Sequence, residues 1–379
     1  MYKDNIYDCA VIGGGLAGLT LSIQLATCGH AVILFEKEQY PFHKVCGEYI
    51  SLESWDFLER IGLPLSNMNV PVIKKLLVTA PNGNSLSIDL PLGGFGISRY
   101  EIDNRLKKIA VQAGVTVIEN CRVDDVVFEN EQFSVYTSTG TVTCKTCCGS
   151  FGKRSNLDIK WKRPFVTNTG NKLHNHVAVK YHIKTSFPAD TIALHNFKDG
   201  YCGISRIEDE RYCLCYLTNA ANLRRSNNSI AEMENSILSR NPVLKNILEN
   251  STRLYAQPLS ISQVSFQQKS QVENHVLLTG DAAGMITPLC GNGMSMAMHG
   301  SKIAAGLIND FLQGKINRQQ LEGQYRKAWK KEFGSRIMTG RIIQRFFGKT
   351  WVTNLFIAFM KRTPVFTRWL IRKTHGDSF

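Results

Sequence analysis

The sequence predicts an α/β fold in which a doubly wound, Rossmann-like domain is interwoven with an antiparallel-sheet domain and followed by a helical C-terminus. Three observations predict it: a strand, turn, helix and strand near the N-terminus, alternating apolar and polar stretches in the middle, and a basic apolar segment at the end. With 379 residues, of which 43% are hydrophobic and 20% charged, the chain has room for two domains with a sizeable core.

The first pattern covers residues 7–37, YDCAVIGGGLAGLTLSIQLATCGHAVILFEK. Gly13 makes a tight turn after the first strand, Gly15 lets N–H groups at a helix N-terminus approach a pyrophosphate, and Gly18 lets helix and strand pack closely. Glu36 ends the second strand, where a carboxylate accepts hydrogen bonds from ribose hydroxyls and disfavours a 2′-phosphate. This pattern fits FAD or NAD. The expected nucleotide-binding residues are Gly13, Gly15, Leu16, Ala17, Gly18, Glu36 and Lys37.

A second glycine-rich stretch, GDAAGMITPLCGNGMSMA at 280–297, separates the two cofactors. A strand over 275–278 runs into it and places Asp281 beside a ribityl hydroxyl or the pyrophosphate, while Pro288 closes a short loop. A helix over 294–311 then directs its free N–H groups and positive dipole end at the flavin pyrimidine, which is negative when reduced. The expected cofactor is therefore FAD. Its expected contacts here are Gly280, Asp281, Gly291, Asn292, Gly293 and Met294.

Together the two motifs resemble the p-hydroxybenzoate hydroxylase-like FAD-dependent oxidoreductase superfamily over roughly residues 7–323. Group A flavin monooxygenases, flavin halogenases and geranylgeranyl reductases belong to it. The resemblance implies an FAD-binding domain of the glutathione-reductase type. ISRYEIDNRLKKIA, residues 97–110, matches the family's Arg, Ile-Asp and helix pattern, which implies that Arg99 contacts the FAD phosphates or ribityl chain. By the same resemblance, Val123 would lie against the adenine through its backbone.

KVCGEYIS, residues 44–51, is similar to a Cys-Gly-Glu stretch of geranylgeranyl reductases that passes close to the flavin ring. The resemblance implies that Cys46 and Glu48 are catalytic, Cys46 as a packing or redox-active thiol and Glu48 as a proton relay. The alternative is that Cys46 only packs and that Glu48 caps a following helix over 52–61. The residues alone do not separate these hypotheses.

Two stretches depart from the family pattern. Hydroxylases carry an Asp-Gly motif that contacts FAD and, indirectly, NAD(P)H, and GSFGKRSNLD has Phe151 in place of the Asp. Geranylgeranyl reductases carry Tyr-x-Trp-x-Phe-Pro over the substrate cavity, whereas GYCGISRIE keeps Tyr201 but has Gly203 and Ser205 at the Trp and Phe positions. The sequence also lacks the Trp-x-Trp-x-Ile-Pro run of halogenases, which disfavours halogenation.

The remaining segments predict a largely antiparallel substrate domain with one face over the flavin, including a hairpin that turns at Asn82-Gly83. Histidines in or near its strands are candidates for a catalytic base, although solvent-facing histidines are the commoner case. These histidines are His174, His176, His182 and His195. The expected ranges are 1–68, 97–158 and 266–325 for the FAD-binding domain, 69–96 and 159–265 for the substrate domain, and 326–379 for a basic helical C-terminal segment.

Most of the net charge of +14 lies near the C-terminus, where Arg326 to Lys373 holds thirteen Lys and Arg but one acid, Glu332. Because the basic residues alternate with bulky apolar ones, this segment suits an interfacial helix at anionic head groups, or a helical cap with a basic solvent face. We expect peripheral membrane contact through 326–374. We expect no nucleic-acid partner, because no nucleic-acid module is recognised.

The eleven cysteines are scattered and odd in number, and no signal peptide is recognised. We therefore expect a cytoplasmic protein, peripheral at the inner membrane face. Cys144, Cys147 and Cys148 form CKTCC without a second Cys/His pair at zinc spacing. This predicts buried strand thiols and no metal.

These features predict an FAD-dependent oxidoreductase, of monooxygenase type, that acts on a hydrophobic lipid-like or aromatic substrate with NADH or NADPH as electron donor. Two alternatives stay open. One is a geranylgeranyl-reductase-like enzyme that saturates isoprenoid double bonds. The other is a non-catalytic, membrane-associated protein that keeps FAD for stability.

Overall fold

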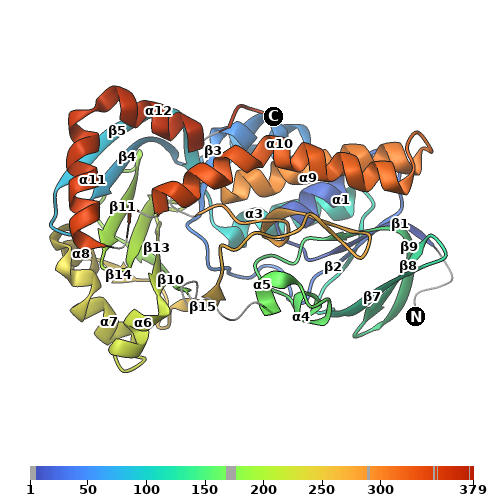
Figure 1. The fold of residues 1–379 in the computed structure, drawn as a ribbon, viewed down its shortest axis with the longest axis horizontal. Coiled ribbons are helices and arrows are strands. Elements are labelled where there is room, and N and C mark those ends of the chain that lie inside the picture. The colour runs from blue at the N-terminus through green and yellow to red at the C-terminus, as the bar shows by residue number, and fades with distance from the viewer. Residues whose placement is uncertain (1–5, 168–175, 288–290, 345, 348, 375) are drawn as a thin grey trace.

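A computed structural model of the chain describes residues 6–167, 176–287, 291–344, 346–347, 349–374 and 376–379. Within these ranges the chain forms two sheets side by side, with helices packed around them (Figure 1). His174 and Pro288, which the sequence singled out, lie outside the described residues. In the described part of the chain, no helix is both long and apolar enough to cross a membrane.

The first sheet is parallel at its centre. Here β1 (Tyr7–Ile12) lies between β2 (Val32–Phe35) and β9 (Gly140–Gly149) and runs parallel to both. The strand order is β16-β17-β9-β1-β2-β6, and β17 is parallel to β9, so the carboxyl ends of β1 and β17 lie at one edge. Both glycine motifs begin at this edge, as doubly wound folds require for nucleotide binding. The remaining strands are β6 (Thr116–Ile118), β7 (Val123–Glu129), β8 (Gln132–Thr137), β16 (Val272–Glu273) and β17 (Val276–Leu278).

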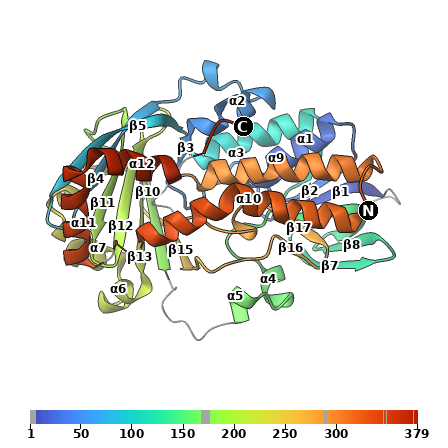
Figure 2. The same cartoon turned by 45° about the horizontal axis from the view of Figure 1, so that its top comes forward.

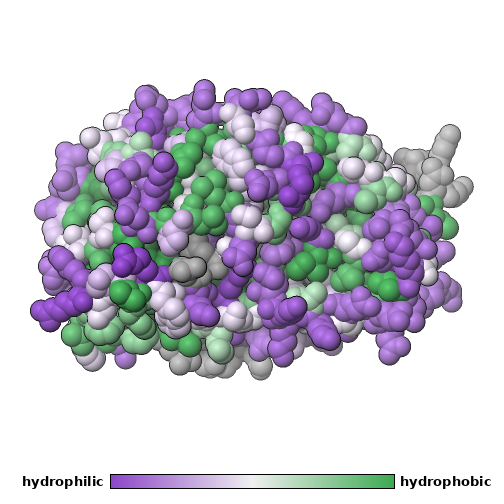
Figure 3. Space-filling view, turned by 90° about the horizontal axis from the view of Figure 1, so that it is seen from above, coloured by the Kyte–Doolittle hydropathy of each residue, from purple (hydrophilic) through white to green (hydrophobic). Residues whose placement is uncertain are grey.

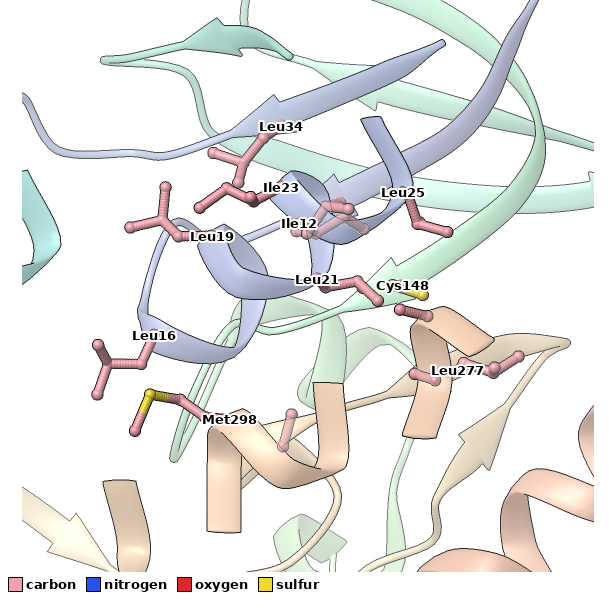
Figure 4. Close-up of a cluster of buried hydrophobic side chains, with 14 of the residues drawn as sticks. Ile12, Leu16, Leu19, Leu21, Ile23, Leu25, Leu34, Cys148, Leu277 and Met298 are labelled. Carbon is pink, nitrogen blue, oxygen red and sulfur yellow. The ribbon is translucent and has the colours of Figure 1, made fainter. Parts of the chain in front are cut away.

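Helix α1 (Leu16–Thr27) forms the centre of the first core. Nearly all of its residues are buried, because it packs on the sheet and also against two other helices, α3 (Arg99–Gln112) and α9 (Gly293–Leu312). Figure 4 shows its leucine side chains around the helix axis, beside Cys148 of β9 and Leu277 of β17. The predicted burial of the CKTCC thiols in β9 is confirmed. Short helices complete this half: α2 (Trp55–Arg60), α4 (Asn156–Lys160) and α5 (Pro164–Thr167).

The second sheet is antiparallel except where β11 (Thr191–Phe197) pairs with β4 (Val72–Thr79), and its strand order is β14-β10-β13-β12-β11-β4-β5-β3. The largely antiparallel expectation is thus confirmed. Its β3 strand falls within 1–68, which the sequence assigned to the FAD-binding domain, because the chain crosses between the two halves there. The other strands are β3 (Tyr49–Ser51), β5 (Ser85–Gly96), β10 (His176–Lys184), β12 (Gly200–Arg206), β13 (Tyr212–Asn219), β14 (Thr252–Arg253) and β15 (Leu259–Val264).

Each face of the second sheet is covered differently. One face packs against the short helices α6 (Ala220–Arg225), α7 (Ile230–Ser236) and α8 (Pro242–Glu249). On the other face lie α11 (Thr350–Arg362) and α12 (Pro364–Thr374), which pack on β4 and β5. The long helix α10 (Arg318–Gln344) runs from the first half toward these two helices (Figure 2).

Candidate functional site

The first glycine motif folds as the spacing predicts, between the end of β1 and the start of α1. A Cβ atom on Gly18 would lie 2.0 Å from the carbonyl oxygen of Gly13, so only glycine permits this helix to approach the turn. A Cβ atom on Gly15 would point toward two cations, 3.4 Å from Arg99 Nη2 and 3.8 Å from Lys44 Nζ. The space in front of Gly15 is therefore electropositive and open to backbone contact.

Those two cations share one buried acid. Arg99 donates two hydrogen bonds to Asp103, at 2.9 and 2.7 Å, and Lys44 Nζ lies 3.1 Å from the same carboxylate. This arrangement holds both cations beside the N-terminus of α1, where a diphosphate gains from both the charge and the free N–H groups. The sequence analysis named Arg99 but missed Lys44, although Lys44 lies only two residues before Cys46, where the Cys-Gly-Glu stretch begins.

Glu36 is buried at the end of β2 and binds the turn itself. Its Oε2 atom accepts a hydrogen bond from Gly14 N at 2.9 Å, and its Oε1 atom accepts one from Glu38 N at 3.1 Å. The two other residues expected at the adenosine end are placed differently. The Lys37 side chain is 70% exposed and pairs with Glu38, while the Val123 carbonyl accepts a hydrogen bond from Asn156 Nδ2 at 3.0 Å.

The second glycine motif follows β17 as a 3₁₀ turn, Gly280–Ala282, that is held from below by two buried cations. Lys269 donates to the Asp281 carbonyl at 2.8 Å, and Arg163 donates to the Ala282 carbonyl at 3.1 Å. Burial lowers the pKa of Lys269 to about 8. Neither cation was predicted from the sequence, because both come from segments that lack a recognised motif.

Both motifs face one cavity of about 250 Å³. Residues of the first half line it on one side and strands β10 to β13 of the second sheet line it on the other, so residues from opposite ends of the chain meet there. Eleven of the expected cofactor-binding and catalytic residues line it: Gly15, Leu16, Ala17, Cys46, Glu48, Arg99, Gly280, Asp281, Gly291, Gly293 and Met294. Gly13, Gly18, Glu36, Lys37, Val123 and Asn292 do not line it, and Gly13 and Gly18 act instead on the shape of the turn.

Glu48 is fully buried in a polar cluster at the wall of this cavity. Its carboxylate pairs with Lys180 Nζ, accepts a hydrogen bond from Arg99 N at 2.8 Å, and lies 2.6 Å from His182 Nε2. Burial opposes ionisation, but the charge of Lys180 and the contacts of His182 outweigh it and lower the pKa of Glu48 to about 2. Glu48 is therefore a carboxylate anion at neutral pH rather than a proton carrier.

The alternative role for Glu48, as the cap of a helix over 52–61, is wrong. A 3₁₀ helix begins there at Leu52, and the Ser51 hydroxyl accepts the hydrogen bond from Glu53 N at 3.4 Å. Glu48 instead accepts the N–H of the first residue of α3. The backbone of Glu48 has a positive φ of 55°, which turns its side chain away from the helix that follows.

Two histidines in the second sheet, His182 and His195, are buried rather than solvent-facing, contrary to the commoner case, and His176 is half-buried. His182 pairs with Glu48, and His195 is fully buried with its Nδ1 atom 2.9 Å from Thr79 Oγ1. Burial lowers the pKa of His195 to about 4, so it is neutral. Lys180 and His182 are two residues apart in β10 and share its inward face, a signal that the alternation of HVAVKYHIK carried but that sequence reasoning did not use.

The cavity that both motifs face is called the flavin cavity below, after the cofactor that the sequence predicts. The segment 43–49 separates it from a second cavity of about 210 Å³. Glu48 lines the first, whereas its partners Lys180 and His182 line the second. Cys213 lies in the same cluster, so Glu48, His182 and Cys213 are the one group in the described ranges whose atoms could hold a metal ion. The ammonium of Lys180 already supplies the positive charge that this carboxylate needs.

Cys46 lies in the same wall, with its Sγ atom 3.5 Å from Met294 Sδ at the start of α9. Tyr201, Gly203 and Ser205 also line the cavity, so the two small residues leave open the volume that Trp and Phe would fill. Phe151 packs against Trp161, with ring centroids 6.1 Å apart, and offers no polar group in place of the missing Asp.

Residues 7–331 match the protein family described as FAD binding domain. The chain belongs to this family. The resemblance to p-hydroxybenzoate hydroxylase-like enzymes is thus confirmed, and the protein is an FAD-dependent oxidoreductase. The residues in place fit FAD, because Gly15 presents bare backbone beside the side-chain cations of Arg99 and Lys44, which suit a diphosphate. Gly15, Arg99 and Lys44 would hold the diphosphate, and Asp281 and the N-terminus of α9 the flavin end.

Similar proteins carry several different names. Conditioned medium factor receptor 1 of Dictyostelium discoideum is 26% identical over 375 residues, covering 87% of this chain and 69% of that protein. Digeranylgeranylglycerophospholipid reductase of Methanococcus vannielii is 26% identical over 350 residues, covering 86% and 83%. The flavin-dependent brominase Bmp2 has the same fold, with a TM-score of 0.78 at 20% identity over 98% of this chain and 93% of that one.

Proposed function

We propose that this FAD-dependent oxidoreductase is a reductase that saturates a double bond in a long apolar chain, with NADH or NADPH as electron donor. One observation carries the proposal. An apolar channel of about 100 Å³ between the second sheet and the C-terminal helices shares four lining residues with the flavin cavity. These residues are Tyr49, Ile192, Leu194 and Gly291.

The channel suits a hydrocarbon chain. It is lined by aliphatic and aromatic residues from β4, β5, β11 and helices α10 to α12, and no lining residue carries a charge. Burying a chain there is favourable by about 0.8 kcal/mol per methylene group. A relative that is named a digeranylgeranylglycerophospholipid reductase supports an isoprenoid chain as substrate.

Saturating a carbon–carbon double bond consumes one hydride and one proton. Bound FAD, once reduced, supplies the hydride. The chain must supply the proton, hold the double bond near the flavin and exclude water. We assign the proton to the Cys46 thiol, which faces the cavity, because Glu48 is ionised.

The test begins with anaerobic addition of NADH or NADPH to the purified FAD-loaded protein. Loss of the flavin colour is expected, followed by its return when a polyprenyl alcohol is added, with a product that has gained two hydrogens per double bond. A product that gains one oxygen atom in air would establish a monooxygenase instead. Failure of both nucleotides and of dithionite to support turnover would favour the non-catalytic protein.

A variant tests the channel separately. Ile88 of β5 lines the channel but not the flavin cavity, so Ile88→Trp should abolish turnover of long chains while leaving the bleaching of flavin by nucleotide unchanged. Leu92→Trp, at a 37% exposed position of β5 outside both spaces, is the matched control. Equal turnover by the two variants would remove the channel from the substrate path.

A further inference from the structure

The C-terminal helix pair α11–α12 is apolar on two opposite faces. On the inner face Ile357, Met360 and Ile371 are buried and line the channel. On the outer face of α11, Trp351, Leu355 and Phe359 recur at intervals of four residues and are 70%, 65% and 49% exposed. A helix that is apolar all round is normally buried on all sides. The outer face therefore lacks a partner within the described part of the chain.

The exposed strip continues from α11 to α12. The Phe359 and Phe366 rings lie 5.8 Å apart, and the Phe366 and Trp369 rings 5.7 Å apart, so the aromatic rings form one row across both helices. Val365, 73% exposed, lies beside them. Figure 3, which looks down on the side that carries α12, shows hydrophobic patches between hydrophilic ones on this surface. Such rows of exposed aromatic side chains mark interaction surfaces.

The positive charge around the strip favours an anionic partner. Residues 333–376 contain nine Lys and Arg and no Asp or Glu, and Lys361, Arg362 and Arg368 are exposed on the same two helices. A second copy of this chain would bring like charges together across the interface. Anionic lipid head groups would complement them, at about 1 kcal/mol per cation near the surface. Tryptophan and phenylalanine rings favour the boundary between head groups and acyl chains.

We propose that the outer face of α11–α12 docks on an anionic bilayer and that the protein takes its substrate from it. α11 has thirteen residues and is about 20 Å long, so it would lie along the interface rather than across it. Docking would place the roof of the channel at the membrane surface. The identity of the cargo rests on the proposed function, whereas the docking surface stands on these helices alone.

Co-sedimentation with vesicles tests the docking without any turnover. The FAD-loaded protein should sediment with phosphatidylcholine vesicles that contain phosphatidylglycerol, and much less with pure phosphatidylcholine or at high salt. The triple variant Trp351→Ser, Leu355→Ser, Trp369→Ser should partition about tenfold more weakly. Because its positions are 70%, 65% and 53% exposed, it should keep its flavin content and unfolding temperature.

The matched control is the triple variant Val111→Ser, Tyr136→Ser, Ile159→Ser, whose positions are 50%, 43% and 52% exposed in the other half. It should sediment like the parent protein. The proposal is overturned if the parent ignores anionic vesicles, if the two triple variants bind alike, or if the first variant only converts a dimer into a monomer. Vesicle binding without substrate turnover would instead leave docking intact and count against the reductase.

Discussion

The two ends of the flavin cavity are built on different principles. At the nucleotide end, backbone N–H groups and the Arg99 and Lys44 cations surround a turn that tolerates no side chain at Gly18. At the substrate end, side chains from β11 and β12 offer shape and apolar surface, with Tyr201 among few polar groups. Recognition by backbone and charge demands particular residues at fixed spacings, whereas recognition by shape accepts many residues. For this reason the cofactor can be predicted from the sequence, whereas the substrate cannot.

We expect the largest effect from a substitution at Gly18, which should disrupt the nucleotide end of the cavity. A Cβ atom there would lie 2.0 Å from Gly13 O, so Gly18→Ala should prevent the turn from closing and lower the free energy of unfolding by about 3 kcal/mol. We expect a protein that purifies without FAD and melts early, as measured by flavin absorbance and thermal unfolding.

Gly306→Ala is the control for Gly18→Ala. Gly306 lies within α9, and a Cβ atom there would meet nothing within 4 Å. Alanine should stabilise this helix by up to about 1 kcal/mol and leave FAD content unchanged. If both variants bind FAD and melt alike, close packing of the turn is not what holds the cofactor.

The next effect concerns the polar cluster between the two ends. Glu48→Gln would leave Lys180 buried beside a neutral amide, and should lower the free energy of unfolding by about 3–5 kcal/mol. Glu210→Gln, at a side chain that is 86% exposed, should change it by less than about 0.5 kcal/mol. Denaturant titration at neutral pH measures both, and an unchanged midpoint for Glu48→Gln would contradict the buried pair.

Because of the same cluster, we expect the free energy of unfolding to depend on pH. The pKa of Glu48 is about 2 in the folded protein against an ordinary value of 4.5, so its contribution is complete above pH 4.5 and is lost as the pH falls toward 2. That contribution is worth about 3 kcal/mol. The stability difference between the parent protein and Glu48→Gln should therefore shrink over this acidic window, and should stay constant above it.

We expect the smallest effect from a substitution that tests the charge at the nucleotide end. Lys44→Met removes one of the two cations in front of Gly15 and should weaken FAD binding about tenfold, or about 1.4 kcal/mol. Lys37→Met is matched in chemistry and close in sequence, but the Lys37 side chain is 70% exposed. Fluorescence titration of the FAD-free proteins should separate the two, and equal affinities would show that Lys44 does not act on the diphosphate.

The local spacing of glycines, the acid Glu36 and the apolar strands of the first half were sufficient to predict its fold and its cofactor. These features act through the backbone of adjacent residues, so their order along the chain carries the geometry. The burial of the CKTCC thiols followed in the same way from strand composition. The C-terminal helices could also be predicted, because their basic and aromatic composition is unusual over many residues.

Only the folded chain brings Glu48, Lys180 and His182 together, since 132 residues separate Glu48 from Lys180. Their packing contradicts the solvent-facing placement expected for strand histidines, and it excludes the helix-capping alternative for Glu48. Likewise, the channel exists because α11 and α12 return to cover β4 and β5, strands far earlier in the chain. Contacts of this kind depend on the packing of distant segments, whose pairing leaves no periodic trace in either segment.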